Sequence, residues 1–380
     1  TATTEIYTLS LHDALPICRQ FKLDHDLLKI FEIMNVYILK EANEIYHYEC
    51  RPFAMLEREQ QELYMSNFKK LLSGEPDRKL FPVKFLRPED GADGREKAAA
   101  ENGGMPAGGT EDFRTQMILY RGLHGANTEE WVRLMLLIAE KMLMGAPYER
   151  DTVVTFIRGE YFKPTRVRSE ESEESEKDEV GAHPFILCSI NLAEPPQNAL
   201  LFDYAEKEFK YHVLVDPVVK LAAPEGGFFF PVIDDNVSDV NRVLYCAGKA
   251  NEPDAAFIED VLEAERTMTA REERDVFEEV VREVAGERLE AGTLAQVYEA
   301  IHRVIEENEE DEPPRLDVKD MERVLQACGV EHATAEAVEE ALRGAAGDEC
   351  RELKAANVLP SFASKSVKIE TSVATITLSP

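Results

Sequence analysis

Between residues 152 and 245 the chain carries a series of strand patterns with no helical pattern between them. Each is a short apolar or alternating run of the kind that is typical of β-strands. Parallel strands need a crossover of a dozen or more residues, whereas antiparallel strands can follow one another directly. The pattern therefore predicts an antiparallel sheet, with strands at 152–157, 185–191, 199–204, 209–214 and 227–233, and a strand or a helix at 240–245.

The part of the chain before this region mixes strand and helix patterns. Alternating or continuous apolar runs indicate strands, and apolar residues three and four apart indicate helices. These patterns predict strands at 33–39, 44–49 and 79–86 and helices at 57–72, 111–123 and 128–144. Thr128 is the expected N-cap of the last helix, which is apolar nearly all round and is therefore expected to be deeply buried.

Beyond Pro253 the pattern becomes helical, and many of the helical residues are acidic. Glycines at 329 and 344 stand where the C-caps of two short helices belong. The expected helices are 254–265, 270–285, 294–308, 318–328 and 334–342, and strands are expected at 367–370 and 373–378. The predicted fold class is α+β: a mainly antiparallel sheet with packed helices, followed by an acidic helical region and C-terminal strands.

The domain organisation is predicted from composition. Residues 1–17 match, codon by codon, the translation of a common short-read sequencing adapter, so we exclude this segment from fold reasoning. Stretches rich in Gly and Ala or in Ser and charged residues predict flexible insertions near 87–110 and 163–182. The remaining chain divides into an α+β domain at 18–250, a helical region at 251–312, and a helical hairpin with C-terminal strands at 313–380, which we expect to be truncated.

Charge and cysteine content exclude several classes of function. The chain has 43 basic and 74 acidic residues, a net charge of −31, which argues against nucleic-acid and anionic-membrane binding. No apolar run approaches the roughly 20 residues that cross a membrane. The cysteines are scattered without Cys-x-x-Cys spacing, so they predict neither a zinc site nor a disulfide framework. Reduced thiols of this kind favour a cytoplasmic location.

Catalytic motifs are missing from the sequence. It contains no P-loop, no dinucleotide fingerprint, no His-Glu-x-x-His helix and no Gly-x-Ser-x-Gly nucleophile turn. Asp203 with Glu208-Phe209-Lys210 has the residue types of a metal-dependent nuclease, but the spacing is too short for two ordinary strands. Alternating charge on a solvated strand explains this second pattern better. The sequence therefore assigns no reaction and no cofactor.

One polar cluster follows the apolar run at 228–233, and it consists of Asp234, Asp235, Asn236 and Asp239. Carboxylates at the end of a buried strand can bind a divalent cation through hard oxygen ligands. A calcium loop counted from Asp234 would need Gly sixth and Glu twelfth, where Asp239 and Tyr245 stand instead. The alternative is an Asp/Asn turn, because these side chains bond to their own backbone. No metal is assigned to the cluster.

Four stretches of the chain together carry a resemblance to a known family, at 35–38 with 44–45, at 68–74, at 226–235 with 241 and 244–245, and at 324–330. On these stretches, from about Arg19 to its end, the chain resembles an uncharacterised bacterial family, domain of unknown function forty-three seventeen, found largely among Firmicutes of the gut. The family usually has an aromatic residue at position 233 and an arginine at 236, where this chain has Ile233 and Asn236. The resemblance implies no known activity and no catalytic residues.

Two functional hypotheses follow from these observations. The first is a cytoplasmic binding or protein-interaction protein, with an unidentified partner, suggested by the missing catalytic motifs, the acidic loops and the helical hairpin at 318–342. The alternative is a metal-dependent hydrolase of unknown substrate that uses Asp234, Asp235 or Asp239. The two differ in a testable way, because the hydrolase needs these carboxylates to converge in a concave pocket.

Overall fold

The chain divides into two compact units, residues 10–267 and residues 268–380, and each is described here by itself. The expected artificial segment at 1–17 and the expected insertion at 87–110 lie outside the residues that the structure describes. This computed structural model describes residues 28–86, 114–125, 127–145, 148–166, 178–195, 198–213, 216–234, 237–286, 291–306, 314–330, 332–347, 350–359, 367–370 and 375–378.

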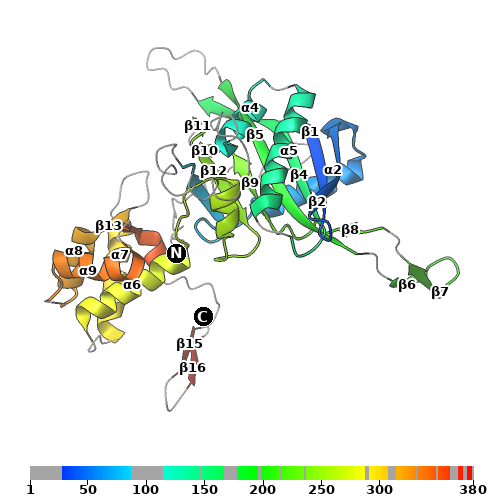
Figure 1. Cartoon of the computed structure of the whole chain (residues 1–380). Helices are drawn as coiled ribbons and strands as arrows, with labels where there is room; N and C mark the ends of the chain where they lie inside the picture. Colours follow the sequence, from blue (N-terminus) through cyan, green and yellow to red (C-terminus); the bar gives the residue numbers. More distant parts are fainter. Residues whose placement is uncertain are drawn as a thin grey trace. The chain divides into compact units, whose positions relative to one another are not determined.

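The first unit contains most of the β-structure, as predicted (Figure 1). Its elements are β1 (Leu28–Leu39), β2 (Glu44–Pro52), η1 (Phe53–Met55), α2 (Arg58–Leu71), β3 (Leu80–Lys84), α4 (Thr115–Leu123), α5 (Thr128–Gly145), β4 (Thr152–Arg166), β5 (Asp178–Glu194), β6 (Asn198–Asp203), β7 (Glu208–Val213), β8 (Val218–Val219), β9 (Gly226–Phe230), β10 (Val232–Asp234), β11 (Val237–Asp239), β12 (Arg242–Ala247) and η3 (Phe257–Val261).

An eight-stranded sheet organises the described part of this unit, in the order β2-β1-β4-β5-β9-β12-β3 with β8 paired to β5. All of its ladders are antiparallel, as predicted. The strands expected at 199–204 and 209–214 are β6 and β7, and they pair with each other in a separate two-stranded sheet instead of joining this one. The longest ladder joins β4 to β5 and runs from Thr152 opposite Leu192 to Arg166 opposite Asp178. Paired strand therefore extends into the expected 163–182 insertion from both sides. The expected α+β fold class is confirmed.

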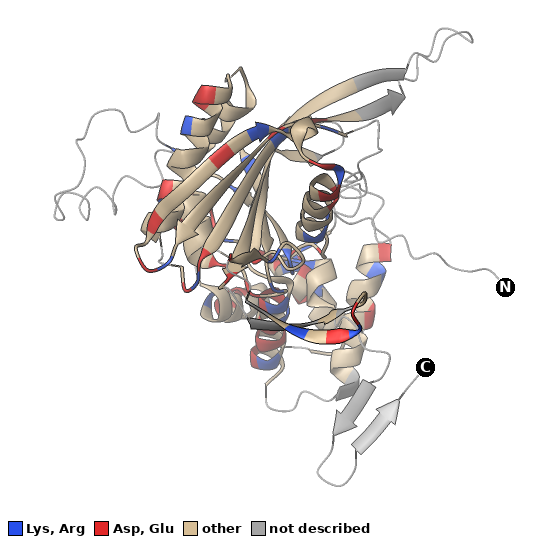
Figure 2. Ribbon diagram, turned by 90° about the vertical axis from the view of Figure 1, so that its right-hand side faces the viewer, with Lys and Arg blue, Asp and Glu red and all other residues tan. Residues whose placement is uncertain are grey.

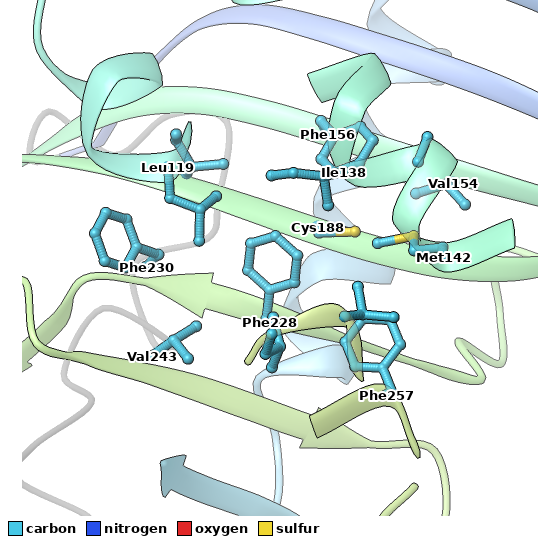
Figure 3. Close-up of a cluster of buried hydrophobic side chains, with 14 of the residues drawn as sticks. Leu119, Ile138, Met142, Val154, Phe156, Cys188, Phe228, Phe230, Val243 and Phe257 are labelled. Carbon is cyan, nitrogen blue, oxygen red and sulfur yellow. The ribbon is translucent and has the colours of Figure 1, made fainter. Parts of the chain in front are cut away.

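One face of the sheet is covered by α4, α5 and the short η3 turn. Inward residues of α5 at helical spacing, Trp131, Met135 and Ile138, are fully buried against it. Phe228 and Phe230 of β9 and Phe156 of β4 point to the same core, together with Leu119, Met142, Val154, Cys188, Val243 and Phe257 (Figure 3). Burying a side chain of this size contributes about 1.5–3 kcal/mol, so this cluster is a main source of the unit's stability.

The opposite face of the sheet is covered by α2. Met65, Phe68 and Leu71 are buried on its inner side. Because side chains alternate along a strand, Phe229 of β9 lies in this second core while its two neighbours lie in the first. The charged residues lie mainly on the helices and near strand ends and turns, and the central strands are nearly free of them (Figure 2). A sheet covered on both faces explains why β9 is buried at every position.

The close approach of the central strands depends on glycine. A Cβ placed on Gly227 would lie 2.0 Å from the Cys188 carbonyl oxygen, far inside van der Waals contact. Gly227 pairs with Ser189 on β5 and with Cys246 on β12, so it has a strand on either side. No side chain larger than hydrogen fits there without moving the strands apart.

Several local expectations are wrong. Asn127, not Thr128, caps α5: its Oδ1 accepts from the Glu130 N–H at 2.8 Å. The expected helix at 254–265 is reduced to a short helical segment that includes the π-type turn η3, after which the chain has no regular structure up to Thr269 apart from a single bridge at Ala264. Helix α5 buries one face, while Met144 is 77% exposed at its end.

The second unit is mainly helical. Its elements are α6 (Ala270–Ala285), α7 (Ala291–Glu306), β13 (Arg315–Asp317), α8 (Val318–Ala327), α9 (Ala335–Ala346), β14 (Glu352–Lys354), α10 (Ala355–Val358), β15 (Val367–Glu370) and β16 (Thr375–Leu378). Its core gathers apolar residues from every helix, among them Phe277, Ile301, Leu325, Leu342 and Val358. The predicted helix 270–285 is confirmed with the same bounds. Helix α9 continues past Gly344 and ends before Gly347, whose φ is 85°.

Two helix–loop–helix pairs, α7–α8 and α9–α10, are joined through their loops by the antiparallel pairing of β13 with β14.

Candidate functional site

The predicted polar cluster lies at the β10–β11 hairpin, where Asp234 pairs with Val237 and Val232 pairs with Asp239. Asp234 is the last residue of β10 and Asp239 is the last residue of β11. Asp235 and Asn236 lie outside the described residues. The backbone thus brings Asp234 and Asp239 onto one hairpin, two residue positions apart along the ladder.

The Asp239 carboxylate accepts hydrogen bonds from residues close to it in the sequence. Its Oδ1 accepts from the Asn241 N–H at 2.9 Å, and its Oδ2 accepts from Arg242 Nε at 2.7 Å. Partial burial acts to raise the pKa of Asp239, but these two donors outweigh it, so the pKa lies below its ordinary value. This is a turn-capping role of the kind that Asp side chains often perform. Within the described residues, no group of three or more His, Cys, Asp or Glu side chains is placed to hold a metal ion.

The predicted helical hairpin at 318–342 corresponds to α8 and α9. The apolar side chains of these helices, Met321, Leu325, Val338 and Leu342, are buried in the core of the second unit. The outward residues of both helices are mainly charged or small. A folded protein marks a docking site by exposed apolar surface, and neither helix exposes a large apolar side chain.

An apolar surface that the sequence patterns did not single out lies on the hairpin of β6 and β7. These strands pair only with each other in the described residues, and they form a two-stranded sheet separate from the eight-stranded one (Figure 1). The register places Leu200 opposite Tyr211 and Phe202 opposite Phe209. Directly opposite residues share a face of the ladder, so these four side chains belong to one face. Glu208 and Lys210 alternate with them and belong to the other face.

The side chains on this apolar face are unusually exposed. Leu200 is 67% exposed, Phe209 is 70% and Tyr211 is 65%, whereas the phenylalanines of β9 are fully buried. The Phe202 and Phe209 rings lie 5.0 Å apart, and Tyr204 at the turn packs edge-on against Phe202 at 5.2 Å. We name this surface, Leu200, Phe202, Tyr204, Phe209 and Tyr211, the hairpin face.

Residues of the hairpin itself form the turn between the two strands. Asp203 and Glu208 close the ladder, and Lys207 adopts a left-handed conformation with φ of 55°. Lys210 Nζ forms an ion pair with Glu206 Oε2 at 2.5 Å across the base of the turn. Asp203, Glu208 and Lys210 thus lie on two paired strands of one hairpin, with Asp203 and Glu208 as the pair next to the turn.

The base of the hairpin is anchored to the large sheet. The chain leaves β5 after Glu194 and returns as β8, which pairs Val219 with Ala193 and Val218 with Glu194. Lys220 donates its N–H to the Leu192 carbonyl at 2.8 Å and pairs with Glu194 through its ammonium group. Both ends of the segment that contains the hairpin are therefore held at the same end of β5.

A network of buried polar side chains also anchors the residues just after β8 to α2 and β5. Asn67 of α2 donates from Nδ2 to the Leu221 carbonyl at 2.8 Å and to Asn191 Oδ1 at 2.7 Å. Its own Oδ1 accepts from the Ser189 hydroxyl at 2.7 Å. Asn67, Ser189 and Asn191 are completely buried. Because buried polar groups must be paired, this network has a defined geometry and orients the segment that follows the hairpin.

A pocket of about 280 Å³ lies near this end of β5, and its lining includes Tyr148, Tyr245 and Asp254. Burial is the main reason why the pKa of Tyr245 rises to about 12, and burial also raises the pKa of Tyr148. The Tyr245 hydroxyl already accepts from the Asp254 N–H at 3.0 Å. Neither phenol is therefore prepared to act as a base near neutral pH.

Comparison with known proteins identifies a family but no characterised relative. A family model described as a domain of unknown function (DUF4317) matches residues 10–102 and 107–380, nearly the whole chain. No curated protein and no solved structure matches the chain significantly. Of the helices in the described part, none is both long enough and apolar enough to span a bilayer.

Proposed function

The chain belongs to the DUF4317 family, whose description names no activity, and from this premise we propose that it is a protein-interaction protein whose hairpin face docks onto another protein chain. The single observation that carries the proposal is the exposure of the hairpin face. Folded monomers rarely expose contiguous aromatic surface, and such surface marks interaction sites. Aromatic residues are also enriched among the residues that contribute most to binding.

The architecture of the hairpin supports this proposal. A two-stranded hairpin is marginally stable by itself and normally needs a covering layer. Among the described residues no layer covers the hairpin face, since Phe209 and Tyr211 remain 70% and 65% exposed. The anchoring of both ends to β5 holds the hairpin at one end of that strand, which limits the conformational entropy that binding removes.

The kind of partner is inferred from charge and chemistry. A net charge of −31 favours a protein partner over nucleic acid or an anionic membrane, both of which need a basic surface. The cysteines of the described residues, Cys50, Cys188, Cys246, Cys328 and Cys350, are free thiols. Free thiols are typical of a reducing compartment, which supports a cytoplasmic site of action.

Site-specific photo-crosslinking tests the proposal. Benzoylphenylalanine is introduced into the full-length chain in place of Phe209 or Tyr211 on the hairpin face. Matched controls carry it in place of Glu208 or Lys210, which are on the same strand but the opposite face. After irradiation of expressing cells, we expect covalent protein adducts from positions 209 and 211 and few or none from positions 208 and 210. Equal adducts from the two faces, or none from either, would contradict the proposal.

A further inference from the structure

We propose that the partner of the hairpin face is a second copy of this chain, so that two hairpins pack face to face in a symmetric dimer. This inference rests on the proposed function, because it names the occupant of the same surface. A two-fold dimer brings the same patch of both subunits together. The hairpin face suits this arrangement, because its two cross-strand pairs, Leu200–Tyr211 and Phe202–Phe209, are all apolar.

The local charge favours a second copy over a basic partner. Residues 198–213 contain three carboxylates and two lysines, so this segment has a net charge of −1 in a chain of −31. Proteins that recognise basic partners surround the apolar centre with acidic residues, because electrostatic complementarity selects the partner. The hairpin has no such acidic excess, and Glu206 and Lys210 already neutralise each other. Two copies can therefore meet here with little like-charge repulsion.

The exposed apolar area of the hairpin face is also large enough for a dimer interface. Exposures of 41–86% for the five side chains of the hairpin face correspond to roughly 600 Å² per chain, since a large aromatic side chain offers about 150–250 Å². Two such faces would bury roughly 1,200 Å², the lower end of the range for specific interfaces. The dimer is therefore expected to have modest affinity, and its population should depend on concentration.

A second hairpin would supply the covering layer that the first hairpin lacks. Two stacked two-stranded sheets form a small sandwich with an apolar interior about 10 Å thick. The interior would consist of the two hairpin faces, and the charged residues Glu208 and Lys210 would remain on the outer surfaces. No buried charge is created, so the association carries no large desolvation penalty.

Sedimentation velocity of the purified full-length chain tests the dimer, over about 1–100 µM to cover the expected micromolar affinity. The variant Phe209→Ser with Tyr211→Ser removes two aromatic side chains from the hairpin face. The matched control, Glu208→Ser with Lys210→Ser, changes the opposite face of the same strand without altering the net charge. The side chains at 209 and 211 are exposed, so we expect all three proteins to unfold at nearly the same temperature.

We expect wild type and control to dimerise with similar Kd values, and the hairpin-face variant to dimerise at least about tenfold more weakly. A wild-type chain that is monomeric throughout, or a hairpin-face variant with an unchanged Kd, would overturn the inference. The photo-adducts distinguish this failure from failure of the proposed function. Adducts between the hairpin face and a different protein would leave the proposed function standing and remove only the second copy.

Discussion

The guanidinium group of Arg158 lies over the indole ring of Trp131, 5.2 Å from the ring centroid. The same guanidinium donates from Nε to Glu32 Oε2 at 2.5 Å, and the other oxygen of Glu32 accepts from the Thr128 hydroxyl. Arg158 comes from β4, Glu32 from β1, and the other two residues from α5. These contacts therefore attach the first turns of α5 to the neighbouring strands β1 and β4 through a nearly buried ion pair.

We expect Arg158→Met to destabilise the protein by about 3–5 kcal/mol, because it leaves the Glu32 carboxylate buried without its partner. Combining it with Glu32→Gln should destabilise less than the sum of the two single changes, because no unpaired charge remains. Urea unfolding of the four proteins measures this coupling. An additive double variant would show that the ion pair makes no coupled contribution.

Gly227→Ala should disrupt the centre of the large sheet. Its Cβ would meet the Cys188 carbonyl oxygen at 2.0 Å, so β5 and β9 must separate. We expect a loss of more than about 3 kcal/mol, or failure to fold. The control is Gly344→Ala, because Gly344 lies in α9 with open space around its Cβ position and should stabilise the helix by up to about 1 kcal/mol. Thermal unfolding of both variants checks the contrast, and similar effects would refute it.

Cys50 should react slowly with alkylating reagents. Burial, with a further contribution from the Glu32 carboxylate, raises the pKa of its thiol to about 11, despite the opposing effect of Arg158. Only about 0.1% of such a thiol is ionised at pH 8, so alkylation should be roughly a hundredfold slower than in the unfolded chain.

The rate of Cys50 alkylation should rise about tenfold per pH unit up to pH 10, because the thiolate is the reactive form. Glu32→Gln removes a nearby negative charge and should lower the pKa of Cys50, which accelerates the reaction. Iodoacetamide labelling followed by mass spectrometry of the peptide that contains Cys50 measures both effects. A folded chain that reacts as fast as the urea-unfolded chain would contradict the assignment.

Asp239→Asn should lower stability by up to about 1 kcal/mol at neutral pH, since the ion pair with Arg242 is partly exposed. The folded-state pKa of Asp239 is lowered, so its contribution is present above the unfolded-state pKa and is lost as the pH falls through the folded-state value. The difference between wild type and variant should therefore shrink as the pH falls below the ordinary pKa of an Asp carboxyl group and vanish in stronger acid. Urea unfolding at several pH values tests this, and a difference that persists in acid would point to a role for the side chain other than its charge.

Local elements were predictable wherever the chain's own pattern dictated them. Helix α6 was expected with its observed bounds because its residues have a helical pattern, and in the structure Thr269 and Glu272 form a capping box at its start. The antiparallel sheet was expected because no helix patterns separate its strands. The expected helix at 254–265 was wrong, because the helical segment that packs Phe257, Ile258 and Val261 into the core is short and ends at Leu262.

The candidate site was less predictable. The Asp234 cluster attracted attention because its carboxylates are adjacent in sequence, but Asp239 is occupied by Arg242 and the Asn241 N–H. The buried network of Asn67, Ser189 and Asn191 joins residues more than 120 positions apart, and single-sequence patterns contain no signal for such a pairing. The alternation of Leu200 and Phe202 with Tyr211 and Phe209 was present in the sequence as a strand pattern. It predicted the two strands without showing that their apolar side chains share an exposed face.

Phe228 and Phe209 show that the sequence predicts strands but not whether their side chains are buried. Both are aromatic residues in strands, and the pattern around each was sufficient to predict its strand. Phe228 is fully buried, because its strand lies between β5 and β12 and beneath α5. Phe209 is 70% exposed, because its strand pairs only with β6 in the described residues. Strand formation follows from neighbouring residues, whereas burial depends on distant segments that pack over the strand. Only the tertiary structure decides which apolar face remains available to a partner.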